Sequence, residues 1–297
     1  MSLRVAIIGA GRIGTSLSAL IKERGHIVEL YDSNPSLGKK LTSNDRFVGG
    51  AQFILLCIPS WATRAVLKNL GELSEGAVVA SFAKGIEHVT LKSIDEVLEE
   101  IIPTASWAVI GGPLMAEELQ EGAGGVAIIA STSKRATQNL TALFEGTGIL
   151  VKTTSNVRGI TLAGVLKNVY GILLGMTDGF GWGLNRKSWL ATLALEEMIV
   201  VVEKLGGGRH TTLVSGGLAD FIVTIMSPHS RHRAVGERLA KTGEVDHNNE
   251  GTASIGSLIT LLKNRHFTVP SLLVLLSKIV VKPSKRQAYF EDFSRTL

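Results

Sequence analysis

The sequence has little of what several protein classes depend on. It has one cysteine, Cys57, so an internal disulfide cannot form and a reducing compartment is expected. Aromatic residues make up only 5 %, which leaves few side chains for stacking on nucleic-acid bases. The 31 lysines and arginines form no long basic block, and the net charge is +5. We therefore expect no nucleic-acid partner, and we interpret the excess charge as a weak attraction for small anions.

Membrane segments and metal-ligand patterns are also not expected. No apolar run reaches the ~18 residues that a membrane span needs. The N-terminus leads directly into an expected strand without a signal-peptide pattern, which favours a cytoplasmic protein. Cysteine and histidine show no metal-ligand spacing, so we expect no metal site. Cys57 lies inside an apolar run, which indicates a buried, inert thiol rather than a nucleophile.

The first half of the chain alternates short apolar runs with amphipathic segments. The apolar runs occupy 3–9, 27–31, 52–58, 76–82, 106–110 and 124–130. Helical patterns occupy 13–24, 61–70, 90–102, 114–120 and 133–146. This alternation predicts an α/β fold, namely a Rossmann-type, doubly wound and mainly parallel sheet with helices on both faces.

The second half of the chain has a different texture. Strand-like runs nearly vanish, and helical patterns follow at 157–179, 187–205, 218–226, 231–241, 252–264 and 270–281. Because domains usually contain ~100–200 residues, the 297 residues predict two of them. We place a Rossmann-type domain at 1–155 and an all-α domain at 156–297.

A glycine-rich turn, Gly-Ala-Gly-Arg-Ile-Gly at 9–14, separates the first strand from the first helix. In that context the pattern predicts dinucleotide binding. Gly9 permits the tight turn, Gly11 leaves room for the pyrophosphate, and Gly14 lets the helix pack on the strand. Arg12 and Ile13 begin the helix, whose N-terminus would face the phosphates. A glycine turn without a ligand is the alternative.

Three further residues follow strands at the same edge of the predicted sheet. Asp32 lies about twenty residues beyond the glycines, where a carboxylate binds the ribose hydroxyls, which favours NAD. NADP is the alternative if Arg12 offsets that charge. Pro59 and Lys84 follow the third and fourth strands, at the end where ligands bind in open α/β sheets. A helix N-cap at Ser60 and a solvated lysine are the simpler interpretations.

A stripe of small and polar residues marks the helical pattern at 157–179. Gly164, Asn168, Gly171 and Gly175 lie on one face, and Lys167 borders it. A lysine among apolar residues costs free energy unless it is paired or functional, and burial would lower its pKa toward acid–base use. Close helix packing, with the lysine reaching out to solvent, is the alternative.

A second cluster of polar residues lies further along the chain. Asp220 and Thr224 are four residues apart and share a helix face. Ser230 is expected to be the N-cap of the next helix, which puts Arg231 at a helix N-terminus, where it would bind an anion. His232 follows. A basic turn that faces solvent is the alternative.

Together these motifs resemble those of the NAD(P)-dependent sn-glycerol-3-phosphate dehydrogenases. The matching segments extend along most of the chain: 9–14, 58–60, Lys84-Gly85, Gly112-Pro113 with 116–118, 165–169, 219–224, Ser230-Arg231 and Glu250-Gly251.

The resemblance implies a role for each residue. Lys167 would exchange the proton of the substrate hydroxyl, Lys84 would lie between substrate and nicotinamide, and Asp220 would hold the catalytic lysine. It further implies substrate binding by Gly112, Asn168, Thr224, Ser230, Arg231 and His232, and cofactor binding by Ala116, Arg231 and Glu250. We expect an enzyme that interconverts dihydroxyacetone phosphate and glycerol 3-phosphate, with a small phosphorylated substrate. The apolar helical domain is compatible with a homodimer.

The chain departs from the family pattern at two positions that contact substrate. His232 stands where the family has asparagine, and Leu114 stands where it has serine or threonine. The connection after Asp32 also lacks a longer, proline-containing loop. A related reductase of a 2-keto or 3-hydroxy acid is therefore an alternative, and a nucleotide-binding protein without catalysis is a third.

Overall fold

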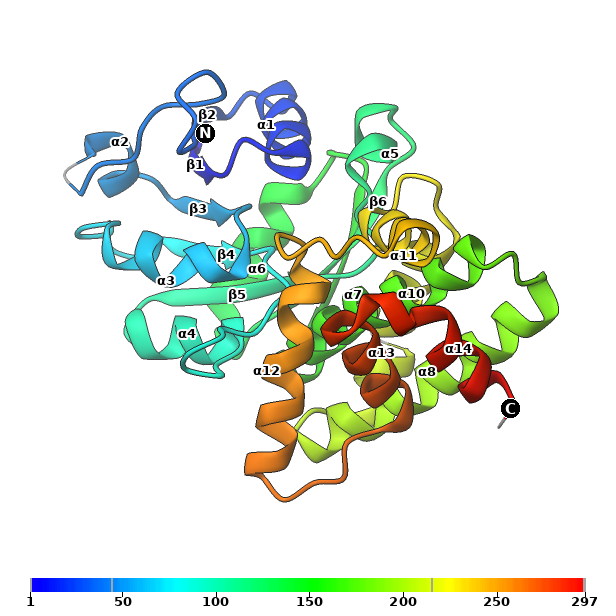
Figure 1. Cartoon of the computed structure of the whole chain (residues 1–297). Helices are drawn as coiled ribbons and strands as arrows, with labels where there is room; N and C mark the ends of the chain where they lie inside the picture. The colour runs from blue at the N-terminus through cyan, green and yellow to red at the C-terminus, as the bar shows by residue number, and fades with distance from the viewer. Residues whose placement is uncertain (1, 44, 215, 296–297) are drawn as a thin grey trace.

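The computed structural model describes residues 2–43, 45–214 and 216–295. The first part of the chain builds a sheet with helices, and the second part builds a helical assembly beside it (Figure 1). Met1 and residues 296–297, which end the predicted domains, lie outside the described residues.

The described part of the chain contains one seven-stranded sheet in the order β2-β1-β3-β4-β5-β6-β7. The strands are β1 (Arg4–Ile8), β2 (Ile27–Tyr31), β3 (Phe53–Leu56), β4 (Val78–Ser81), β5 (Ser106–Gly111), β6 (Gly125–Ala130) and β7 (Ile149–Thr154). Neighbours are parallel except β5 and β6, which are antiparallel. The six predicted strands and the mainly parallel sheet are confirmed, whereas β7 was not predicted.

Helices cover both faces of the sheet because the strands are apolar on both sides. In β1, Val5 and Ile7 pack into one core, and Ala6 and Ile8 pack into the other. The sheet helices are α1 (Arg12–Glu23), α2 (Arg46–Gly49), α3 (Ser60–Lys68), α4 (Ile94–Ile101), α5 (Ala116–Gln120) and α6 (Lys134–Phe144). Residues of α1, α5 and α6 join the first core, and residues of α2, α3 and α4 join the second. This arrangement confirms the doubly wound fold.

The second half of the chain packs around α7 (Val157–Gly179), most of whose residues are buried. The other helical elements of this half are α8 (Leu184–Lys204), α9 (Arg209–Leu213), α10 (Gly217–Met226), α11 (Arg231–Thr242), α12 (Glu250–Asn264), α13 (Ser271–Val281), the 3-10 turn η1 (Pro283–Lys285) and α14 (Arg286–Ser294). The predicted helices are confirmed to within a few residues, whereas α2, α9 and α14 were not predicted.

Helix α7 is, against expectation, long and apolar enough to cross a membrane. The whole of its most apolar 18-residue window is buried inside the protein, however. Its apolar residues pack against α8, α10, α11 and α12, so α7 is the core helix of the helical part.

The backbones of α7 and α11 touch where the predicted glycine stripe lies. A Cβ on Gly175 would lie 2.0 Å from the carbonyl oxygen of Arg233, and one on Gly236 would lie 1.9 Å from that of Ile172. The stripe therefore serves close helix packing at this end. At its other end Gly164 faces the side chain of Lys84.

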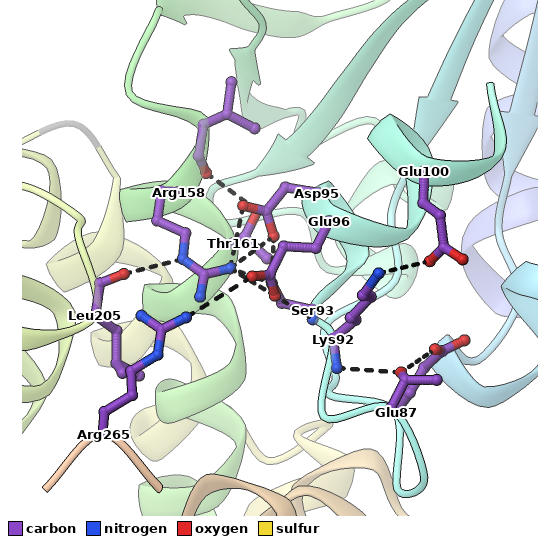
Figure 2. A network of polar contacts seen from close by, with 12 residues as sticks. Glu87, Lys92, Ser93, Asp95, Glu96, Glu100, Arg158, Thr161, Leu205 and Arg265 are labelled. Carbon is purple, nitrogen blue, oxygen red and sulfur yellow. Dashed lines mark hydrogen bonds and ion pairs between the residues drawn. The ribbon is translucent and has the colours of Figure 1, made fainter. Parts of the chain in front are cut away.

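An ion-pair network joins the sheet to the helical part (Figure 2). Arg158, near the start of α7, reaches Asp95 at 3.3 Å and Glu96 at 3.0 Å, both in α4. Its Nε donates to the carbonyl oxygen of Leu205 at 3.1 Å, just after α8. Arg265, after α12, lies 4.0 Å from Glu96. The start of α4 is thus tied directly to α7 and to the segment after α12, and through Arg158 to the end of α8.

Candidate active site

A cleft of about 860 Å³ lies where the carboxyl ends of the strands meet the helical part. Thirteen of the residues predicted for the site line it: Gly9, Gly11, Arg12, Ile13, Asp32, Pro59, Ala116, Lys167, Thr224, Ser230, Arg231, His232 and Glu250. The other predicted residues, Gly14, Lys84, Gly112, Asn168 and Asp220, are not part of the cleft wall.

The glycine loop has the shape that a dinucleotide requires. Gly9 has a φ of +104°, and a Cβ there would lie 2.3 Å from the carbonyl oxygen of Cys57. A Cβ on Gly14 would lie 1.9 Å from the carbonyl oxygen of Gly9, so the helix packs tightly on the loop. Nothing lies within 4 Å of a Cβ on Gly11, whose outer side opens to the cleft. No side chain caps the N-terminus of α1, so its N–H groups are free for phosphate oxygens.

Asp32 supports the loop and faces the cleft. Its Oδ2 accepts a hydrogen bond from the backbone N–H of Ala10 at 2.8 Å, and its Oδ1 accepts one from that of Asn34 at 2.9 Å. Arg12 forms an ion pair with Glu117 at 2.6 Å instead of with Asp32. Arg12, which was considered as a cation that could offset the Asp32 charge, therefore points toward α5.

Glu250 connects the third strand's loop to the helical part. Its Oε1 accepts a hydrogen bond from the backbone N–H of Ser60 at 2.8 Å, and Pro59 is the N-cap residue of α3. The N-cap therefore lies one position before the expected Ser60, which is the first residue of α3. Burial raises the pKa of Glu250, although hydrogen bonds from Ser60 and Lys84 oppose that rise. This carboxyl group lines the cleft from the start of α12.

Two lysines share one carboxylate at the base of the cleft. Lys167 Nζ lies 3.0 Å from Asp220 Oδ1 and donates to Thr224 Oγ1 at 3.0 Å. Lys84 Nζ donates to Asp220 Oδ2 at 2.8 Å. Lys167 comes from α7, Asp220 and Thr224 from α10, and Lys84 from the loop after β4. Only Lys167 and Thr224 reach the cleft wall, and Asp220 holds Lys167 from behind.

The environment of Lys167 brings its pKa into the range of acid–base chemistry. Burial lowers the pKa to about 8, and Lys84 adds to the lowering while Asp220 opposes it. Burial alone would raise the pKa of Asp220, but the ion pairs with Lys167 and Lys84 outweigh it and hold that pKa below its usual value. A lysine with such a pKa is suited to exchanging a proton near neutral pH, and Lys167 has a carboxylate beside it.

Asn168 and Gly112 act from outside the cleft wall. The Asn168 Nδ2 donates to the carbonyl oxygen of Lys84 at 3.3 Å, while its buried Oδ1 has no partner among the described residues. Gly112 has a φ of +91°, and a Cβ there would lie 2.5 Å from the carbonyl oxygen of Val126. Gly112 therefore shapes the turn after β5, and its neighbour Leu114 reaches the cleft.

The start of α11 brings charged and polar groups to the cleft wall near Lys167. Ser230 is confirmed as the N-cap, since its Oγ accepts from the backbone N–H of Arg233 at 3.3 Å. Arg231 is exposed and has no ion-pair partner among the residues described. His232 Nδ1 lies 2.9 Å from Asn249 Oδ1. Burial and the charge of Lys167 lower the pKa of His232 to about 3, so the ring is neutral.

Sequence reasoning missed several residues of the cleft wall: Ser33, Lys40, Trp61, Phe82, Met115, His229 and Asn249. Asn249 carried a usable signal, because an asparagine before a helical pattern is an N-cap and so marks the start of α12. Cys57 lines the cleft but burial raises the pKa of its thiol, which fits the expected inert thiol. Among the described residues, no three His, Cys, Asp or Glu are placed to hold a metal ion.

The family models and the curated relatives indicate one family. The models described as NAD-dependent glycerol-3-phosphate dehydrogenase N-terminus and C-terminus match residues 40–137 and 156–288. The NAD(P)+ glycerol-3-phosphate dehydrogenase of Azotobacter vinelandii is 34 % identical over 259 residues, which cover 80 % of this chain and 76 % of that protein. The enzyme of Chlorobium limicola with the same name is 30 % identical over 270 residues, or 82 % of this chain and 81 % of that protein.

A solved structure shows the same fold over the whole chain. The glycerol-3-phosphate dehydrogenase of Coxiella burnetii superposes with a TM-score of 0.88 and 23 % identity, and the match covers 98 % of each chain. The family models and the curated relatives show that the chain belongs to the NAD-dependent glycerol-3-phosphate dehydrogenase family.

Proposed function

We propose that this protein is an NAD(P)-dependent glycerol-3-phosphate dehydrogenase, which interconverts dihydroxyacetone phosphate and glycerol 3-phosphate. The observation that carries the proposal is the position of Lys167. Its ammonium group reaches the wall of the same cleft that the glycine loop lines, and Asp220 and Thr224 hold it at 3.0 Å each. The curated relatives bear this enzyme's name at 34 % and 30 % identity.

The cleft accounts for cofactor binding by residues of the sheet. The glycine loop, the uncapped α1 N-terminus and the open space over Gly11 fit a dinucleotide pyrophosphate. Asp32 would accept hydrogen bonds from the ribose hydroxyls, because each carboxylate oxygen has a second lone pair. Its charge, which Arg12 does not offset, favours NAD over NADP. When bound, the reduced nicotinamide supplies the hydride.

The proposed proton chemistry belongs to Lys167. In the reducing direction its ammonium donates a proton to the oxygen of the ketone, on which negative charge develops. In the oxidising direction its neutral amine accepts the hydroxyl proton. Asp220 acts as a positioning residue that fixes the direction of Nζ, and Thr224 fixes it from the side. Lys84 is the second ammonium group that pairs with Asp220.

The substrate phosphate is assigned to the start of α11. The guanidinium of Arg231 is free to form a bidentate contact, and the helix N-terminus adds a partial positive charge. Residues 1–155 and 156–297 are proposed as the dinucleotide-binding and substrate-binding domains. A homodimeric assembly and a cytoplasmic location remain predictions.

The direct test is oxidation of NADH with dihydroxyacetone phosphate, with NADPH in a parallel reaction. We expect NADH to be oxidised when dihydroxyacetone phosphate is present, with a higher kcat/KM for NADH than for NADPH. A substrate panel of non-phosphorylated 2-keto acids serves as the control. Turnover of those acids without turnover of dihydroxyacetone phosphate would reject the proposed function and favour a keto-acid reductase.

A further inference from the structure

One side chain of the cleft has its proton position fixed by neighbouring backbone groups. His232 Nδ1 lies 2.9 Å from Asn249 Oδ1. That oxygen also accepts hydrogen bonds from the backbone N–H groups of Gly251 at 2.9 Å and Thr252 at 3.4 Å, as the N-cap of α12. The amide nitrogen of Asn249 is itself a donor and cannot accept from these two N–H groups, so the atom that faces them must be the oxygen. The orientation of the Asn249 amide is therefore determined. Since an amide oxygen accepts and never donates, Nδ1 of His232 must carry the proton.

The other ring nitrogen then has a free lone pair. Nε2 has no hydrogen-bond partner within the described part of the chain, and His232 lines the cleft beside Lys167 and Thr224. The ammonium of Lys167 is already bonded to Asp220 and Thr224. The ring is neutral because burial and the nearby cations lower its pKa. The cleft therefore presents an uncharged acceptor next to its proton donor.

A neutral acceptor selects a particular kind of ligand group. Its lone pair repels a phosphate oxygen, and the neighbouring Arg231 is the better partner for an anion. A hydroxyl group satisfies Nε2 by donating its proton. Leu114 also lines the cleft and offers no hydrogen bond of its own.

We propose that Nε2 of His232 accepts a hydrogen bond from the substrate hydroxyl that is not oxidised, which makes His232 a specificity-determining residue. This inference rests on the proposed function, since dihydroxyacetone phosphate has one such hydroxyl, on the carbon next to the ketone. An analogue without that hydroxyl leaves the acceptor unpaired in a partly buried wall, which costs binding in the transition state.

The first test examines the proton position in the protein without substrate. Ring ¹⁵N NMR of the histidines, with the His232→Asn variant to assign the signal, is expected to show Nδ1 protonated and Nε2 unprotonated at neutral pH. The opposite tautomer, or a charged ring, would overturn the inference. The tautomer is read from the wild-type protein, the variant serves only for assignment, and no turnover is needed, so the result does not depend on the proposed function.

The second test compares dihydroxyacetone phosphate with acetonyl phosphate, in which hydrogen replaces the free hydroxyl. Wild-type protein is expected to prefer dihydroxyacetone phosphate by about 10-fold or more in kcat/KM. The His232→Leu variant is expected to lose most of that preference. The matched control is His88→Leu, an exposed position in the loop after β4, where the preference should stay unchanged.

The outcomes separate the two proposals. An active wild type whose preference is the same as that of His232→Leu would overturn the role of His232 alone. A change confined to the KM of NADH would assign Nε2 to the nicotinamide amide and would also overturn it. Absence of any turnover of dihydroxyacetone phosphate by the wild type would reject the proposed function itself, while the NMR result would still stand.

Discussion

Lys167 is a charged residue buried in the core helix of the helical part. Its position costs folding free energy, because burial lowers its pKa to about 8 from its usual value of 10.5. A group whose pKa is lowered by folding reduces stability at pH values below that pKa, and the penalty disappears as pH rises toward the unfolded value. A lowered pKa in a group that lines a cleft and has a specific charge partner marks Lys167 as a candidate functional group.

Replacement of Lys167 by methionine should separate catalysis from stability. Lys167→Met is expected to lower kcat by roughly 10²–10⁴-fold, since the proton donor is lost. The melting temperature at pH 7 should not fall, because Asp220 keeps its ion pair with Lys84. Steady-state kinetics and thermal unfolding measure the two effects, and NADH binding by fluorescence serves as the control. Normal turnover would remove Lys167 from the mechanism.

The pH dependence of the reaction should follow the protonation of Lys167. Reduction of the ketone needs the ammonium form, so its rate is expected to fall as pH rises through about 8. Oxidation of the alcohol needs the neutral amine and should rise over the same range. The measurement is kcat against pH in both directions.

Removal of the Asp220 charge should move this transition. Asp220→Asn takes away an anion that favours the ammonium form, so the transition is expected at lower pH, by about one unit or more. Asp246→Asn, which alters an exposed ion pair with Arg238, is the control and should leave the profile unchanged. A shift to higher pH in Asp220→Asn would contradict the assignment.

At the scale of elements, the crossing of α7 and α11 positions two sides of the site. It places Lys167 near His232, because Gly171 leaves room for the side chains of Thr224 and His232. Further along, the helix backbones meet at Gly175 and Gly236. Side chains at those points would push the helices apart.

A methyl group at this crossing should destabilise the protein. Gly236→Ala is expected to lower the free energy of unfolding by about 1–3 kcal/mol, since its Cβ would overlap the carbonyl oxygen of Ile172. The matched control is Gly256→Ala in α12, where nothing lies within 4 Å of the new Cβ. That variant should gain about 0.5–1 kcal/mol from helix propensity. Urea unfolding compares them, and equal effects would refute the packing argument.

The periodicity of apolar residues predicted most helices and strands, but it missed elements whose conformation depends on tertiary contacts. Strand β7 was missed because it reads Ile-Leu-Val-Lys-Thr-Thr, and it lies at the sheet edge with several exposed residues. Helices α2 and α9 are four and five residues long, too short for a helical period to show.

The sequence indicated which residues belong to the candidate site better than it indicated which side chains contact one another. Spacing placed Asp220 and Thr224 on one face and Lys167 on another helix. Pairing of one carboxylate with two lysines depends on how α7, α10 and the β4 loop pack, which no local pattern encodes. The same holds for the bond between His232 and Asn249, since it joins two helix termini.

At the scale of the whole molecule, the Arg158 network holds the sheet against the helices (Figure 2). Arg158→Ala would leave the buried carboxylate of Asp95 without its cation. We expect a loss of about 3 kcal/mol in the free energy of unfolding. Arg295→Ala, which breaks an exposed ion pair with Asp292, is the control and should change stability by less than about 1 kcal/mol. Similar losses in both variants would show that the network is not a junction.

The shared carboxylate of Asp220 also bears on the order in which the chain becomes complete. The lysines at 84 and 167 leave the ribosome well before residue 220. Before α10 has been synthesised, burial of α7 would leave the ammonium group of Lys167 in an apolar core without the Asp220 carboxylate. A nascent chain that ends before residue 220 should therefore contain a folded sheet, while α7 is not yet packed and is sensitive to protease. Catalytic competence then appears late in synthesis and only in chains whose two halves have already met.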